Sequence, residues 1–148
     1  MTEEIPNLWP SDISISIVSP VAILNQQASR LRELTRGLLE ARVKSSLSTN
    51  GMRTHQFQII AQALDYTYDL FRAWHDPNLV YPVTVEWSEW LSGNIGDDGT
   101  QLAYSPSQFI TLLQTIFQSS QTKSVIHSLL ARINDSQISQ SDLPVTPP

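Results

Sequence analysis

The sequence predicts an α+β fold: a four-stranded antiparallel meander from about residue 38 to 88, with an N-terminal helix and a C-terminal helical hairpin packed on one face. Three observations support this prediction. Apolar and polar side chains alternate through the centre of the chain, turn-forming residues separate the alternating runs, and a Ser-Pro pair opens a helical pattern on either side. A meander of this kind leaves its second face toward water.

The chain has 148 residues, the length of one domain, and is 41% hydrophobic and 16% charged, which is typical of a globular protein. We expect an irregular N-terminal arm over residues 1–18 and a single α+β domain over residues 19–134. Residues 135–148 are rich in Ser, Gln and Pro, and the sequence predicts a disordered tail there.

The first helix begins at Ser19-Pro20, an N-cap residue followed by proline at the first helical position, and ends before Gly37. Its predicted core-facing stripe has helical spacing and consists of Val21, Leu24, Ala28, Leu31 and Leu34.

The first two strands are predicted from period-two alternation. Leu39, Ala41 and Val43 alternate with polar residues, Asn50-Gly51 suits a tight hairpin turn, and alternation resumes from His55. In the second strand the apolar set is Phe57, Ile59, Ala61 and Ala63, with Ile60 on the polar side.

For the third strand, strict alternation puts Tyr66, Tyr68, Leu70 and Trp74 on one face and Thr67, Asp69, Phe71, Ala73 and His75 on the other. A turn at Asp76-Pro77-Asn78 leads to the last strand, whose apolar face is Leu79, Tyr81, Val83, Val85 and Trp87. Because Pro82 cannot donate a hydrogen bond, this strand is predicted to be an edge.

Residues 55–75 are also compatible with one amphipathic helix, since Phe57, Ile60, Leu64, Tyr68 and Phe71 have helical spacing. Two strands are favoured because this stretch is dense in β-branched and aromatic residues. Beyond it, Ser88–Tyr104 is predicted to be a loop, Ser105-Pro106 opens a second helix, and a third follows Ser119-Ser120.

Composition sets several classes of function aside. The net charge of −5 and scattered basic residues argue against nucleic acid as the partner. The chain has no cysteine, no apolar run near the roughly 18 residues of a membrane span, and no signal pattern, so we expect a cytoplasmic protein without membrane contact.

No catalytic, cofactor-binding or metal-binding motif stands out, and we predict none. Asp69 and His75 share a predicted strand face, but six residues of strand separate them by about 20 Å, which excludes an acid–base pair. The three histidines do not stand at metal-ligand spacing.

A candidate interaction surface comes from apolar residues placed among polar ones. Ile60, Phe71 and Ala73, with His75, fall on the polar face of the predicted sheet, and Trp87 and Trp90 stand at the end of its last strand. Two alternatives remain open. The arm before Ser19 folds across these apolar residues of the sheet and makes them core, or the two tryptophans close the core.

The leading hypothesis is a non-enzymatic, cytosolic protein-binding domain, such as an accessory, inhibitor or immunity-type protein, that uses the exposed sheet face. Its partner would be another protein, and the acidic net charge suits a basic one. The alternative is a small-ligand binder or enzyme with a pocket between sheet and helices, using Tyr66, Tyr68, Arg72 and His75.

Overall fold

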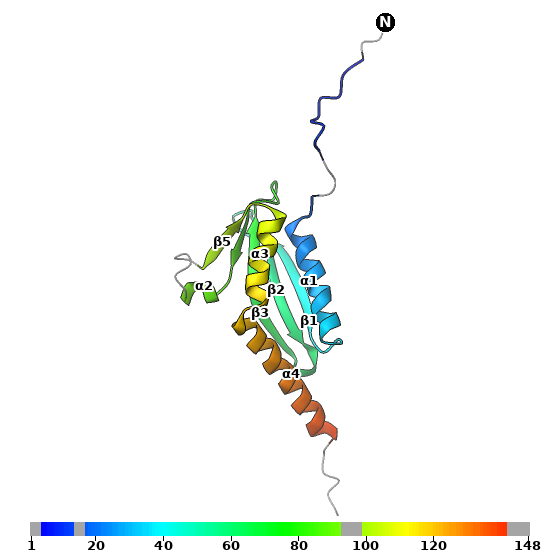
Figure 1. Ribbon diagram of the computed structural model, residues 1–148, viewed down its shortest axis with the longest axis vertical. Coiled ribbons are helices and arrows are strands. Elements are labelled where there is room, and N and C mark those ends of the chain that lie inside the picture. Colours follow the sequence, from blue (N-terminus) through cyan, green and yellow to red (C-terminus); the bar gives the residue numbers. More distant parts are fainter. Residues whose placement is uncertain (1–3, 14–16, 93–98, 142–148) are drawn as a thin grey trace, which may run out of the picture.

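The computed structural model describes residues 4–13, 17–92 and 99–141, and it has two layers. Three helices lie on one face of an antiparallel sheet of five strands (Figure 1). The predicted α+β class is therefore confirmed, with one strand more than expected. The helices cover one side only, so the second face of the sheet defines the surface considered below.

The strands follow one another across the sheet in the order of the chain, β1-β2-β3-β4-β5. The helices are α1 (Pro20–Leu34), α2 (Glu89–Ser92), α3 (Pro106–Phe117) and α4 (Ser120–Ser141), and a short 3-10 turn η1 spans Gln62–Leu64. The strands are β1 (Glu40–Leu47), β2 (Arg53–Ala61), β3 (Tyr66–His75), β4 (Val83–Glu86) and β5 (Thr100–Ala103).

Both predicted Ser-Pro helix starts are present. The Ser19 hydroxyl accepts a hydrogen bond from the backbone N–H of Ala22 at 3.2 Å, and Ser105 accepts one from Gln108 at 3.2 Å. Each cap satisfies one of the N–H groups that a helix start leaves without a partner. After α1 the chain turns at Gly37, whose φ of +81° is a conformation that glycine adopts without strain.

Residues 55–75 form two strands and not one helix. The link between β2 and β3 is η1 followed by Asp65, which has a φ of +48°. Aspartate tolerates this left-handed conformation better than most residues, so the turn forms without glycine.

The pairing of β2 with β3 contains a β-bulge that the sequence prediction missed. Phe57 lies opposite Phe71, but its neighbour Gln58 lies opposite Asp69, which leaves Leu70 as an extra residue. One extra residue reverses the alternation beyond it. Phe71 therefore joins Leu70 on the helix-covered side, together with Ala73 and His75.

The sheet also differs from the prediction at its edge. Residues 100–103, predicted to lie in a loop, form β5, and Val83 lies opposite Ala103 there. β4 therefore has neighbours on both sides and is not an edge strand. Pro82 stands just before β4 begins, so its missing N–H removes no hydrogen bond from the ladder.

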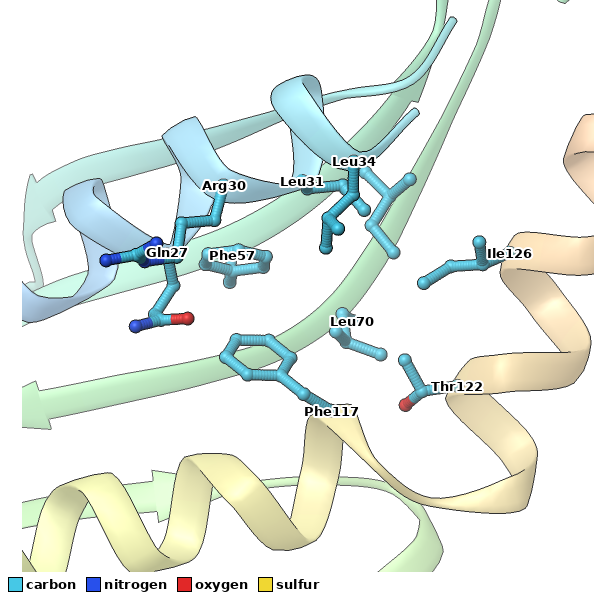
Figure 2. Close-up of a pocket in the computed structure, with 10 residues that line it drawn as sticks. Gln27, Arg30, Leu31, Leu34, Phe57, Leu70, Phe117, Thr122 and Ile126 are labelled. Atoms are coloured by element: carbon cyan, nitrogen blue, oxygen red, sulfur yellow. The ribbon is translucent and has the colours of Figure 1, made fainter. Parts of the chain in front are cut away.

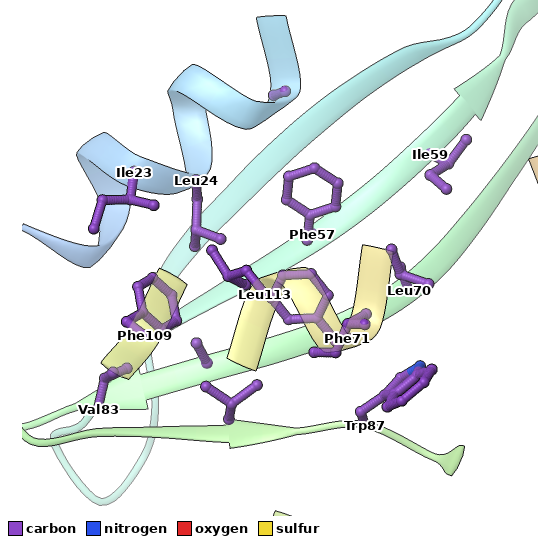
Figure 3. Close-up of a cluster of buried hydrophobic side chains, with 14 of the residues drawn as sticks. Ile23, Leu24, Phe57, Ile59, Leu70, Phe71, Val83, Trp87, Phe109 and Leu113 are labelled. Carbon is purple, nitrogen blue, oxygen red and sulfur yellow. The ribbon is translucent and has the colours of Figure 1, made fainter. Parts of the chain in front are cut away.

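The core fills the space between the sheet and helices α1, α3 and α4, and Figure 3 shows its part under α1 and α3. Leu24 from α1, Phe57 from β2 and Phe109 from α3 are all almost completely buried. The predicted stripe of α1 is only partly correct, because Ile23 is buried whereas Leu34 is 82% exposed. The helix buries the half nearest its start and leaves its last turn toward solvent.

The described part of the N-terminal arm and helix α4 extend from the sheet in opposite directions (Figure 1). The described part of the predicted arm has no helix or strand, and Trp9 is 75% exposed. Helix α4 continues to Ser141 and so runs past residue 135, where the tail was predicted to begin; residues 142–148 lie outside the described part of the chain. Among the described residues, no helix is both long and apolar enough to cross a membrane.

Candidate functional site

The candidate site is the face of the sheet that no described element covers, here called the open face. The strand register puts the following side chains on it: Glu40, Arg42, Lys44, Ser46, Thr54, Gln56, Gln58, Ile60, Thr67, Asp69, Arg72, Trp74, Thr84, Glu86, Thr100 and Leu102. Its cations, Arg42, Lys44 and Arg72, match its anions, Glu40, Asp69 and Glu86, in number. The open face is thus neutral although the chain is acidic.

Hydrogen bonds across strands hold much of the open face in place. Arg42 donates through Nε and Nη2 to the Gln58 side-chain oxygen at 3.1 and 2.9 Å, and the Gln58 amide nitrogen donates to Asp69 at 2.7 Å. This ladder joins β1, β2 and β3. On β3 and β4, Arg72 donates to Glu86 at 2.7 Å. Charged bonds of this kind fix the orientation of the side chains that they join.

Trp74 is the aromatic side chain of the open face and stands one residue before the end of β3, near the β1–β2 hairpin. It lies between Thr54 on β2 and Thr84 on β4, and the Arg72 guanidinium stands 5.3 Å from the centre of its ring. A hollow of about 310 Å³, the Trp74 hollow, opens between these residues and the β1–β2 hairpin, with Ser48, Thr49, Asn50 and Met52 on the hairpin side.

Because of the bulge at Leu70, most of the predicted interaction surface does not form. Ile60 lies on the open face and is half-buried, as the alternation predicts. Phe71, Ala73 and His75 lie on the other face and are only 3%, 0% and 6% exposed. Their expected exposure was wrong because strict alternation was carried past the extra residue. For the same reason, the sequence prediction wrongly placed Trp74 on the helix-covered side.

Trp87 and Trp90 are buried as well, so the alternative in which they close the core is the observed one. Their rings meet edge to face with centroids 5.6 Å apart. Such a pair stabilises the fold through the edge-to-face geometry of its rings as well as through the apolar area that it buries. Neither residue adds to an exposed surface.

A buried polar cluster was not anticipated from the sequence. His55 and His75 face each other diagonally across β2 and β3, with their Nε2 atoms 3.0 Å apart. His75 Nδ1 lies 2.9 and 3.0 Å from the carbonyl oxygens of Asp76 and Leu79 and must therefore donate. When both rings are neutral, His55 donates through Nε2 to His75 and accepts the Ser45 hydroxyl at Nδ1, at 2.7 Å.

The surroundings of this cluster determine the basicity of His55. Burial, followed by the charges of His75 and Arg53, lowers the pKa of His55 from 6.5 to about 4, which makes it a weak base near neutral pH. Ser45 and His55 resemble a nucleophile and its base, but they line neither the Trp74 hollow nor the apolar cavity described below. The register of the β2–β3 hairpin explains the contact between the two histidines. Residue 53 lies opposite residue 75, so His55 lies diagonally across from His75.

The His55 pKa predicts how stability depends on pH. Between pH 6.5 and about 4 the unfolded chain binds a proton at this histidine and the folded chain does not, so the free energy of unfolding falls as the pH falls. We expect a loss of about 1–3 kcal/mol over this range. Urea titrations at several pH values measure it.

The control for this pH dependence is a pair of variants. His55→Asn should flatten the slope of unfolding free energy against pH, whereas His127→Asn, at an exposed position on α4, should leave the slope unchanged. Equal slopes in both variants would show that carboxyl groups, not His55, cause the loss of unfolding free energy at acidic pH.

The ligand pocket of the alternative hypothesis does not form from the predicted residues. Tyr66 and Tyr68 line a hollow beside α4, Arg72 is on the open face, and His75 is buried with His55. An apolar cavity of about 170 Å³ does lie between the sheet and the helices (Figure 2). Sheet residues Phe57, Ile59 and Leu70 line it from one side, and the helices contribute Gln27, Arg30, Leu31, Leu34, Phe117, Thr122 and Ile126.

Asp69 and His75, excluded as an acid–base pair by distance, are in fact on opposite faces of the sheet. Within the described ranges, no group of three or more His, Asp or Glu side chains gathers in a way that could hold a metal ion.

Comparison with known proteins gave no match. No protein-family model, no curated protein and no solved structure is significantly similar to this chain.

Proposed function

We propose that this chain is a non-enzymatic protein-binding domain that acts in the cytoplasm and takes its partner onto the open face. The observation that carries the proposal is the arrangement around Trp74: a half-buried aromatic ring on the middle strand of the sheet, beside a hollow and next to the bonded Arg72–Glu86 pair. Interfaces commonly combine an aromatic anchor with polar groups around it.

The charge of the open face indicates what kind of partner it suits. Because the three cations and three anions are balanced, and Arg72 is already bonded to Glu86, the face offers no basic stripe for a nucleic acid. A protein with paired charges and an apolar centre fits it. The net charge of −5 would assist the approach of a basic partner from a distance.

Trp74→Thr tests the proposal. Threonine suits a strand and resembles the flanking Thr54 and Thr84, so the fold should persist while the aromatic anchor is lost. In pull-downs from lysate of the native host, quantified by mass spectrometry, we expect a partner captured by the wild type to fall by at least tenfold.

Ile110→Thr is the matched control, since it removes an exposed apolar side chain from α3, on the helical layer. It should retain capture. If Ile110→Thr abolished capture and Trp74→Thr did not, the partner would bind the helices and the open face would be ruled out.

A further inference from the structure

The apolar cavity between α1, the α3–α4 junction and the sheet has the dimensions of a small-molecule site. Its volume of about 170 Å³ is close to that of the apolar cavity, about 150 Å³, known to bind benzene in a protein core. One ring or one branched chain would fill it. An α-helix, about 10 Å across, is too wide for it.

The interior of the cavity is apolar. Phe57 and Leu70 form its floor and are 2% and 4% exposed, while Phe117 and Ile126 approach from the helical side (Figure 2). Thr122 is the polar side chain at this end, and its hydroxyl already donates to the Ile116 carbonyl at 2.7 Å. A ligand therefore finds few polar groups here and must be apolar at this end.

The opposite end of the cavity is polar. Gln27 and Arg30 are three residues apart on α1, which puts them on one face of the helix, and their polar groups lie on the same side of the cavity, away from Ile126 (Figure 2). Neither of the ion pairs found among the described residues involves Arg30. Its guanidinium and the Gln27 amide are N–H donors for an anion.

We propose that this cavity binds a small amphipathic carboxylate, with an aromatic ring or branched chain seated between Phe57, Leu70 and Ile126 and its carboxylate bonded to Arg30 and Gln27. An arginine fork matches a carboxylate in shape and charge. The seated ligand also covers Leu34, which is 82% exposed at the rim. The site is on the helical side of the sheet and is independent of the protein-binding proposal for the open face.

Phenylacetate is the probe, and benzylamine is its charge-reversed analogue. In titrations followed by ¹H–¹⁵N NMR of the full chain, we expect saturable shifts at the cavity residues and at least tenfold tighter binding of phenylacetate than of benzylamine. Arg30→Gln should weaken phenylacetate about tenfold, because one charge-assisted bond is lost. Arg32→Gln is the matched control, because Arg32 is paired with Glu40 at 3.8 Å and does not line the cavity.

Ile126→Phe fills the cavity and should abolish phenylacetate binding. If that variant does not fold, Leu31→Phe fills the space from the opposite wall. The proposal is overturned if phenylacetate gives no saturable shifts, if benzylamine binds equally well, or if Arg30→Gln and Arg32→Gln have the same effect. Binding that appears only after Trp9→Ser would also overturn it and would assign the cavity to the chain's own arm.

Discussion

Replacing Phe71 with aspartate is expected to unfold the domain. Phe71 is 3% exposed, its ring stacks on Phe57 with centroids 5.2 Å apart, and Phe117 meets it edge-on at 5.8 Å. Emptying such a site costs about 3–5 kcal/mol, and a buried carboxylate adds several more. Together these approach the whole stability of a typical domain, about 5–15 kcal/mol. Circular dichroism and urea melts measure the loss.

Thr67→Asp is the control for Phe71→Asp, because it adds the same charge to the same strand on the open face. It should remain folded, within about 1 kcal/mol of the wild type. A folded Phe71→Asp protein would contradict the observed register and mean that the bulge can move, turning residue 71 outward.

Leu24→Ala is expected to destabilise the protein by about 2–5 kcal/mol, since Leu24 is completely buried between α1 and the sheet. Leu34→Ala, at the exposed end of the same helix, should change the free energy of unfolding by no more than about 0.5 kcal/mol. Chemical denaturation of the two variants provides the comparison. Equal losses would show that the last turn of α1 packs against the body in solution.

The features that were predictable from the sequence depend on neighbouring residues. The helix starts at Ser19 and Ser105 could be predicted because a capping hydroxyl bonds a backbone N–H three residues away. The Asn50-Gly51 hairpin is local in the same sense, with Gly51 at a φ of +85°. Four of the five strands follow from alternation. β5 has no apolar alternation, because its larger apolar residue, Leu102, is 50% exposed on the open face and only Ala103 is buried.

The candidate site was harder to predict because it depends on one extra residue. In the run from Tyr66 to His75, the adjacent apolar residues Leu70 and Phe71 break the alternation, and this was the only local sign of a bulge. The bulge is favourable because packing against the helices buries both side chains, and that packing is tertiary. The bulge also determines which face Trp74, four residues after Leu70, occupies.

The order of the strands has a consequence for how the chain folds. Each strand pairs only with its neighbour in sequence, and α1 packs on the strand that follows it. Such contacts close short loops, so little chain entropy is lost before each one forms. The sheet can therefore grow one hairpin at a time from β1 toward β5, and on a ribosome the first hairpin could pair before the last helices have been synthesised. α3 and α4 are synthesised last and complete the core, so until then the apolar side of the growing sheet has α1 as its main cover.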